Sequence, residues 1–291
     1  MWPFSRAPVV PVLRFHGPIG MSTPLRPGLS ISTAAPVIER AFALSKLPAV
    51  AVSINSPGGS PVQSSLIFKR VRQLAEEKKK KVYVFCEDVA ASGGYYLAAT
   101  GDEIHADASS IIGSIGVISA SFGLDKAIEK LGVERRVYTS GTSKGALDPF
   151  RPENADDIAR LKAIQRDIHD VFIGVIKDRR AEKLKGPDEE LFSGAFWSAA
   201  RALELGLIDG VSDLRTRMRE LFGDKVRLKP IAISSGGLLG RFRRVEGAAT
   251  LGTAGTSWPD LAALGDLAGG ALPDQLISAL EARALWARYG L

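Results

Sequence analysis

One serine in the segment DVAASGGYYLAATG, residues 88–101, is surrounded by residues with almost no side chain. Ser92 stands between Ala91 and Gly93, where a helix should begin after the short apolar strand KVYVFC. A serine attacks a carbonyl carbon only if a base removes its proton and hydrogen-bond donors stabilise the oxyanion that forms. The segment therefore favours either tight packing or nucleophilic chemistry at Ser92.

Backbone donors for such an oxyanion can be sought on two neighbouring segments. At the start of a helix the N–H of Gly93 has no acceptor within the helix, and the positive end of the helix dipole lies beside it. A second donor would come from SPGG, residues 56–59, because a glycine turn after a buried strand presents N–H groups without a Cβ in the way. Each motif alone is compatible with ordinary packing, whereas both on consecutive strand–helix units favour a shared site.

A general base has few candidates in this sequence. His16, His105 and His169 lie in no motif, and we expect each to be structural or solvated. Lys144, in TSGTSKGALDPF, lies in a loop bounded by glycines after an expected strand. A lysine acts as a base when burial keeps its amine neutral, so Lys144 would need an apolar pocket.

The composition is that of a globular chain without internal disulfides. Its 291 residues are 45% hydrophobic, enough for the core of one large domain or two small ones. Cys86 is the one cysteine, which excludes an internal disulfide and a multi-cysteine metal site. We expect Cys86 to be an inert thiol at the end of a buried strand, and we expect no metal or cofactor.

The net charge of +6 does not by itself indicate a nucleic-acid site. The run KKKK, residues 78–81, would close an amphipathic helix, where cations suit the helix dipole, and it lacks interleaved aromatic residues. A second basic group, GRFRR at 240–244, lies in a glycine-rich tail and is compatible with peripheral contact to an acidic membrane surface. No apolar run reaches 18 residues, and proline and arginine interrupt the N-terminal segment too often for a signal peptide. We therefore expect a cytoplasmic protein.

The elements that would position these residues alternate between strands and helices. Expected strands cover residues 9–15, 49–54, 82–86, 103–106, 111–118 and 134–139. Expected helices cover 33–46, 61–78, 123–131 and 155–180, with further helices from Ser92 and within 193–206 before a final short strand. Ser60 as N-cap, Pro61 at the first position and Gln63 as the partner in a capping box predict the start of the second helix. The alternation predicts parallel βαβ units.

Three further expectations concern the long helix, the end of the later helix and the division into domains. The helix 155–180 carries one apolar stripe, formed by Ile158, Leu161, Ile168, Val171, Phe172 and Val175. Gly206 is the expected C-cap of the later helix. Residues 1–230 are expected to form the main domain, and 231–291 a Gly/Ala/Leu-rich extension with a short helix near 274–289.

Four ordered segments resemble the signal peptide peptidase A family of serine proteases, relatives of the proteolytic subunit of Clp protease. They are INSPGGS, AASGGYYLAATGDEIHADASSIIGSIGVI, LGVERRVYTSGTSKGALDPF and ALELGLIDGV, and the resemblance covers about residues 9–230. It implies a ClpP/crotonase-type α/β spiral of βαβ units, with a largely parallel sheet flanked by helices. Members of this family usually carry an N-terminal membrane anchor, which we do not expect here.

The resemblance also implies a Ser–Lys dyad. Ser92 would be the nucleophile, Lys144 the general base, and Ser114 the hydroxyl that holds the lysine amine. Gly59 and Gly93 would form the oxyanion hole. In this family the site is assembled between neighbouring subunits, so we expect a homo-oligomer that cleaves extended or unfolded peptides, such as signal-peptide remnants or membrane-protein fragments.

Two other functions stay open at the level of the sequence. A protease fold without activity would serve as a scaffold or as a peptide-binding protein. A crotonase-like enzyme would use paired backbone amides to hold an acyl-CoA thioester. Its chemistry usually calls for acidic residues, and the apolar motif segments INSPGGS and AASGGYYLAATG contain none.

Overall fold

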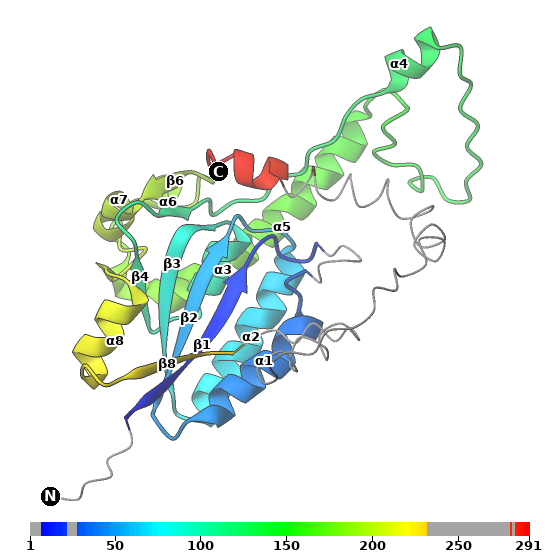
Figure 1. Cartoon of the computed structure of the whole chain (residues 1–291). Coiled ribbons are helices and arrows are strands. Elements are labelled where there is room, and N and C mark those ends of the chain that lie inside the picture. The colour runs from blue at the N-terminus through cyan, green and yellow to red at the C-terminus, as the bar shows by residue number, and fades with distance from the viewer. Residues whose placement is uncertain (1–6, 22–27, 232–279, 281–282) are drawn as a thin grey trace, which may run out of the picture.

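The computed structural model describes residues 7–21, 28–231, 280 and 283–291, in which helices flank a largely parallel sheet (Figure 1). The central strands are β1 (Val9–His16), β2 (Ala49–Ser56) and β3 (Lys81–Ala91). The sheet runs in the order β6-β5-β3-β2-β1-β8, and β4 pairs with β3 and β7. The outer strands are β4 (Glu103–Ala106), β5 (Ile111–Gly113), β6 (Phe196–Ser198), β7 (Gly210–Val211) and β8 (Arg227–Pro230). The pair β5–β6 is antiparallel and the other pairs are parallel, which confirms the predicted fold class.

Helices cover both faces of the sheet. The main core joins one face to α1 (Ile31–Leu44), α2 (Pro61–Glu77), α3 (Gly93–Ala98) and α5 (Ala155–Arg180). A second cluster joins the opposite face to Met218 of α8 (Leu214–Phe222). The shorter helices are α4 (Asp125–Lys130), α6 (Asp188–Leu191) and α7 (Ala199–Glu204). Because β2 is buried on both faces, its sequence AVAVSINS is almost continuously apolar.

The start of α2 confirms half of the predicted capping. The Ser60 hydroxyl accepts a hydrogen bond from the N–H of Gln63, and Pro61 occupies the first helical position. The capping-box role of Gln63 is wrong, since its Oε1 accepts from the N–H of Ile31 at 2.8 Å while the N–H of Ser60 donates to Ile19. Gln63 thus links α2 to the beginning of α1.

Three of the expected strands need correction. β3 continues past Cys86 to Ala91, where its last residues pair with β5. β5 ends at Gly113, because Gly113 and Ser114 have positive φ values of 113° and 53° and turn the chain away. Residues 134–139 form no strand, because the exposed segment that contains them offers no pairing edge within the described residues.

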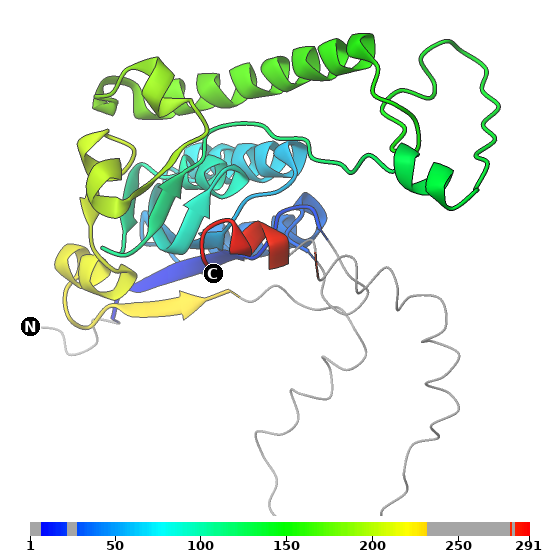
Figure 2. The same ribbon diagram turned by 90° about the horizontal axis from the view of Figure 1, so that it is seen from above.

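Residues 118–154, called the arm below, project away from the sheet and carry α4 (Figures 1 and 2). The helix α5 follows the arm and has the bounds expected from the sequence. Of the apolar stripe expected on α5 only Phe172 is buried, and Val171 is 61% exposed. Ile176, which lies outside that stripe, is also buried. The first half of α5 reaches beyond the sheet toward the arm (Figure 2).

The later part of the chain is partly described. Gly206 ends α7 with a φ of 76°, as expected, and the short strand β7 follows, whereas β6 falls in a segment expected to be helical. Trp286 and Tyr289 pack against the ends of β3 and β5. The basic group at 240–244 and half of the expected terminal helix lie outside the described residues, while residues 280 and 283–287 are helical. The boundary at 230 stays a prediction. No helix of the described ranges is long and apolar enough to cross a bilayer.

Candidate active site

Ser92 occupies the turn between β3 and α3 in a strained backbone conformation. Its φ of 52° and ψ of −123° are unfavourable for any residue that carries a Cβ. The conformation is fixed on both sides, because the N–H of Ser92 donates to the carbonyl of Gly113 at 2.8 Å and its carbonyl accepts from Tyr96 at 3.0 Å. The fold therefore holds one serine at the carboxyl end of a buried strand.

The small residues around Ser92 are required by packing. A Cβ added to Gly58 would lie 2.8 Å from the Cβ of Ser92, closer than real Cβ contacts. A Cβ added to Gly94 would overlap the carbonyl oxygen of Ser56. The chain segments beside the serine thus approach each other through glycine backbone, which also leaves their amides accessible to a ligand.

Two of these amides lie close together and lack an acceptor. Within the described part of the chain, the N–H groups of Gly59 and Gly93 make no hydrogen bond. A Cβ added to Gly93 would lie 3.4 Å from the nitrogen of Gly59, which shows how near the two residues are. Gly59, with a φ of 141°, is held by Ile19, whose N–H donates to Gly58 and whose carbonyl accepts from Ser60. The pair can donate to one oxyanion beside Ser92.

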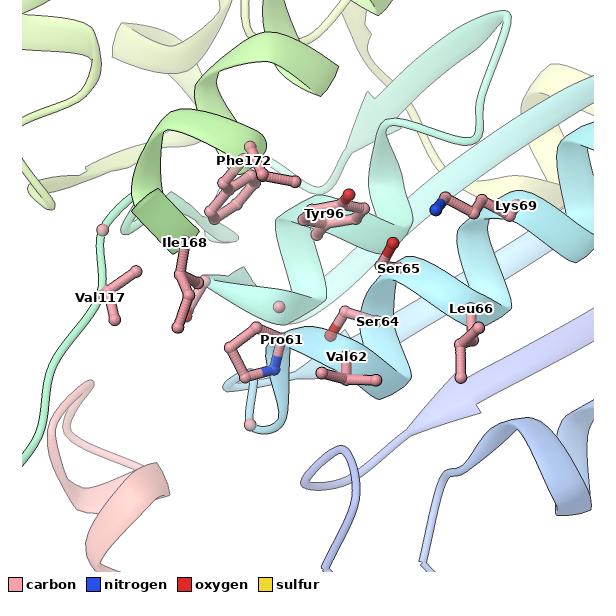
Figure 3. A pocket seen from close by; sticks show the side chains of 15 residues that line it. Pro61, Val62, Ser64, Ser65, Leu66, Lys69, Tyr96, Val117, Ile168 and Phe172 are labelled. Carbon is pink, nitrogen blue, oxygen red and sulfur yellow. The ribbon is translucent and has the colours of Figure 1, made fainter. Parts of the chain in front are cut away.

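A pocket of about 280 Å³ opens at Ser92, Gly59 and Gly93 (Figure 3). Its walls come from α2, α3, α5 and the segment after β5. The other lining residues are Pro61, Val62, Ser64, Ser65, Leu66, Lys69, Tyr96, Gly116, Val117, Ile168, Val171 and Phe172. Most of this lining is apolar, and no acidic side chain contributes to it.

Lys144 and Ser114, the other two residues expected at the site, do not line this pocket. Lys144 is exposed in the arm, where its N–H donates to Gly141 at 3.2 Å. Ser114 is buried one residue after Gly113, the acceptor for Ser92, and its own N–H donates to Ala195 at 2.7 Å. A single chain thus brings together Ser92, Gly59 and Gly93 but leaves Lys144 apart from them.

The histidines and the cysteine have structural surroundings. His16 makes a hydrogen bond to Ser53, His105 is buried beside Glu103, and Nε2 of His169 lies 3.1 Å from a backbone carbonyl oxygen. None of the three lines the pocket. Cys86 is buried, and burial raises the pKa of its thiol to about 12, so it stays protonated.

The wall of the pocket on α2 was not predicted from the sequence. Val62, Leu66 and Lys69 follow one another at intervals of four and three residues, which places them on one side of a helix. This spacing was visible in the sequence. The pocket itself could not be predicted from this spacing, because the residues that face α2 come from α3 and from α5, far along the chain.

Comparison with known proteins identifies a matching protein family and several relatives that differ in length. A model described as peptidase family S49 matches residues 74–225. A Synechocystis sp. protein provisionally named a protease is 36% identical over 195 residues, covering 64% of this chain and 68% of the relative. The chloroplastic serine protease SPPA of Arabidopsis thaliana is 32% identical over 173 residues, covering 58% of this chain and 25% of that protein.

A relative from Brucella abortus is 54% identical over 283 residues and is named the Na⁺/H⁺ antiporter NhaA. The match covers 97% of this chain but only 37% of the Brucella protein. The antiporter name belongs to that whole protein and is not transferred to the present chain.

Proposed function

Because the chain belongs to peptidase family S49, the signal peptide peptidase A family of proteases, we propose that it is a serine endopeptidase whose nucleophile is Ser92. The observation that carries the proposal is the strained turn at Ser92, beside two glycine amides without acceptors and an apolar pocket. The Ser92 oxygen would attack the peptide carbonyl, and the N–H groups of Gly59 and Gly93 would stabilise the oxyanion. The leaving amine departs with a proton, and water then hydrolyses the acyl-enzyme.

We place the general base, Lys144, on a second copy of the chain. Support comes from the arm, which projects from the sheet and exposes large apolar side chains: Phe122 by 83%, Leu131 by 77% and Tyr138 by 91%. Apolar surface of this kind is typical of a protein–protein contact. An arm that docks beside the neighbour's pocket would bring Lys144 to Ser92, and the closed interface would favour the neutral amine. The hydroxyl of Ser114 would then hold that amine.

Extended peptides are the proposed substrate class. The turn 56–59 follows the buried strand β2, so backbone groups at this edge can pair with an extended chain, while the pocket takes an apolar side chain. Signal-peptide remnants and membrane-protein fragments are rich in such side chains and are the proposed natural source.

The first experiment is labelling of the assembled protein with a fluorophosphonate, followed by mass spectrometry. We expect one adduct, on Ser92, which is absent from Ser92→Ala because the nucleophile is gone. It should also be strongly reduced in Lys144→Ala, because the serine proton then has no acceptor. Lys126→Ala removes another exposed lysine of the same arm and should label like the parent protein.

An intact oligomer that leaves Ser92 unlabelled would contradict the proposed function. The protein would then be better described as a scaffold or a peptide-binding protein with a protease fold.

A further inference from the structure

The pocket beside Ser92 has a polar end that the proposed chemistry does not use. We propose that this pocket selects peptides with an apolar residue at the cleavage point and a carboxylate three or four residues away, and that Lys69 is the residue that binds the carboxylate. The inference rests on the proposed function, because it takes the pocket to be the substrate site.

The apolar part of the pocket lies between α2 and α5 (Figure 3). Val62 and Leu66 contribute from α2, while Ile168 and Phe172 contribute from α5. Val62 is 63% exposed although it lines a pocket, so a bound side chain would remove apolar surface from water. An apolar substrate residue next to the reacting carbonyl would fill this part.

The polar part of the pocket holds three donors without an acceptor. Ser65 and Lys69 lie four residues apart and therefore share one side of α2. Figure 3 shows the Lys69 ammonium turned toward the side of the pocket on which Ser65 and Tyr96 lie. Neither Ser65 nor Lys69 has a hydrogen-bond or ion-pair partner among the described residues, whereas the adjacent Arg70 pairs with Glu39 at 2.6 Å.

Tyr96 adds an independent indication that a ligand is missing at this end. Its side chain is 4% exposed, and its buried hydroxyl has no hydrogen-bond partner in the described part of the chain. Buried hydroxyl groups are normally paired, so an unpaired one in a residue that lines the same pocket as Lys69 indicates an acceptor supplied from outside. The charge of Lys69 and the lack of acidic lining residues select an anionic acceptor over a neutral or cationic one.

The length of the pocket sets the spacing of the two substrate groups. Pro61 and Lys69 both line the pocket and lie eight residues apart on α2, which is about 12 Å along the helix. An extended peptide advances about 3.3 Å per residue. The distance from the nucleophile's end of the pocket to Lys69 thus corresponds to about three or four peptide residues.

Peptide binding to the assembled Ser92→Ala protein tests the inference without catalysis. The probes are fluorescent peptides with one central apolar residue and a single Glu moved through the flanking positions, each compared with its Gln counterpart by anisotropy. We expect a Glu three or four residues from the centre to bind about three- to tenfold more tightly than Gln.

The variants are built on Ser92→Ala. The Glu preference should disappear in Lys69→Gln, reverse in Lys69→Glu, and persist in Lys78→Gln, which removes an exposed lysine outside the pocket. Tyr96→Phe keeps the ring against Phe172, 4.9 Å away between centroids, and should weaken the preference without lowering stability.

Equal binding of Glu and Gln peptides at every position would overturn the inference, as would a preference that survives Lys69→Gln or a complete lack of peptide binding. A Lys69-dependent preference in a protein that cleaves no peptide would instead refute the proposed protease activity while supporting the binding site. The two failures are therefore distinguishable.

Discussion

At the scale of single residues, the serine is held in a conformation that costs free energy. Residues with a Cβ in such a region of backbone space typically cost about 1–3 kcal/mol. The hydroxyl of Ser92 does not offset this cost, because it makes no hydrogen bond within the described residues. The fold therefore maintains Ser92 for a purpose other than stability.

Replacement of Ser92 by glycine should show this strain. Glycine removes the Cβ and relieves the strain, but costs about 0.5–1 kcal/mol in backbone entropy. We expect Ser92→Gly to unfold with a free energy between unchanged and about 2 kcal/mol higher, measured by urea denaturation. Ser92→Ala keeps the Cβ and serves as the matched control, with stability close to that of the parent. A Ser92→Gly protein less stable than Ser92→Ala would disprove the strain argument.

Residue types alone predicted part of the site. Ser92, Gly93 and the turn 56–59 were identified because glycine-rich turns after consecutive buried strands meet at one edge of a parallel sheet. The choice of Gly59 within that turn came from the family resemblance. The role of Gln63 was not predictable in the same way, since its acceptor oxygen serves Ile31, which lies 32 positions earlier in the chain.

At the scale of elements, the last turn of α5 is fixed by a buried ion pair. Arg180 is 1% exposed, and its guanidinium donates to the carboxylate of Asp209 and to the carbonyl of Gly206. Asp209 also accepts from the N–H of Ile104 in β4 at 2.7 Å. One carboxylate thus connects the end of the long helix to the sheet.

The carboxylate of Asp209 should make the free energy of unfolding depend on pH. Burial raises the pKa of Asp209, but hydrogen bonds from Arg180 and Lys183 outweigh burial and bring the pKa to about 2. Since the unfolded value is about 3.9, the contribution of Asp209 is complete above about pH 4 and is lost as the pH falls toward 2. Asp209→Asn should cost about 3–5 kcal/mol at pH 7, because it leaves Arg180 buried without a counter-ion.

The measurement is urea unfolding of the parent protein and of Asp209→Asn at pH 7 and near pH 2. The difference between their free energies of unfolding should be smaller at the lower pH. Glu134→Gln, which breaks the exposed pair with Arg136, is the control and should behave like the parent. A constant difference across this range would exclude titration of Asp209 as its cause.

The elements were predictable where the pattern is long and local. The helix 155–180 has its expected bounds because many turns repeat the same apolar spacing. The segment ERRVYT has β-branched and aromatic residues but no neighbouring strand in the part of the chain that the structure describes, so its composition was misleading. The strand β6 was missed because only its pairing with β5, a distant segment, makes it a strand.

At the scale of the whole molecule, one chain does not complete the proposed site. The base lies in the arm and the nucleophile lies in the sheet, and a sequence pattern cannot show which copy supplies each of them. Mixing two inactive variants can show whether the serine and the lysine of one site come from different copies. Ser92→Ala and Lys144→Ala, combined in equal amounts, should regain about a quarter of the parent peptidase activity, because random assembly pairs an intact serine with a neighbour's intact lysine that often.

Native mass spectrometry of the mixture confirms that subunits have exchanged, and two Ser92→Ala preparations mixed together give the background. Exchange without any recovery of activity would place both residues in the same chain and refute the shared site.

The long helix that carries the arm also acts as a lever. Its 26 residues span about 39 Å, and its fulcrum is the last turn, where Arg179 and Arg180 tie it to the body. A tilt of one degree at the fulcrum moves the far end by about 0.7 Å, and a misplacement of about 1 Å can slow an enzyme a hundredfold. In the proposed assembly, the ion pairs of Arg179 and Arg180 therefore help to set how precisely the neighbouring copy's site is aligned.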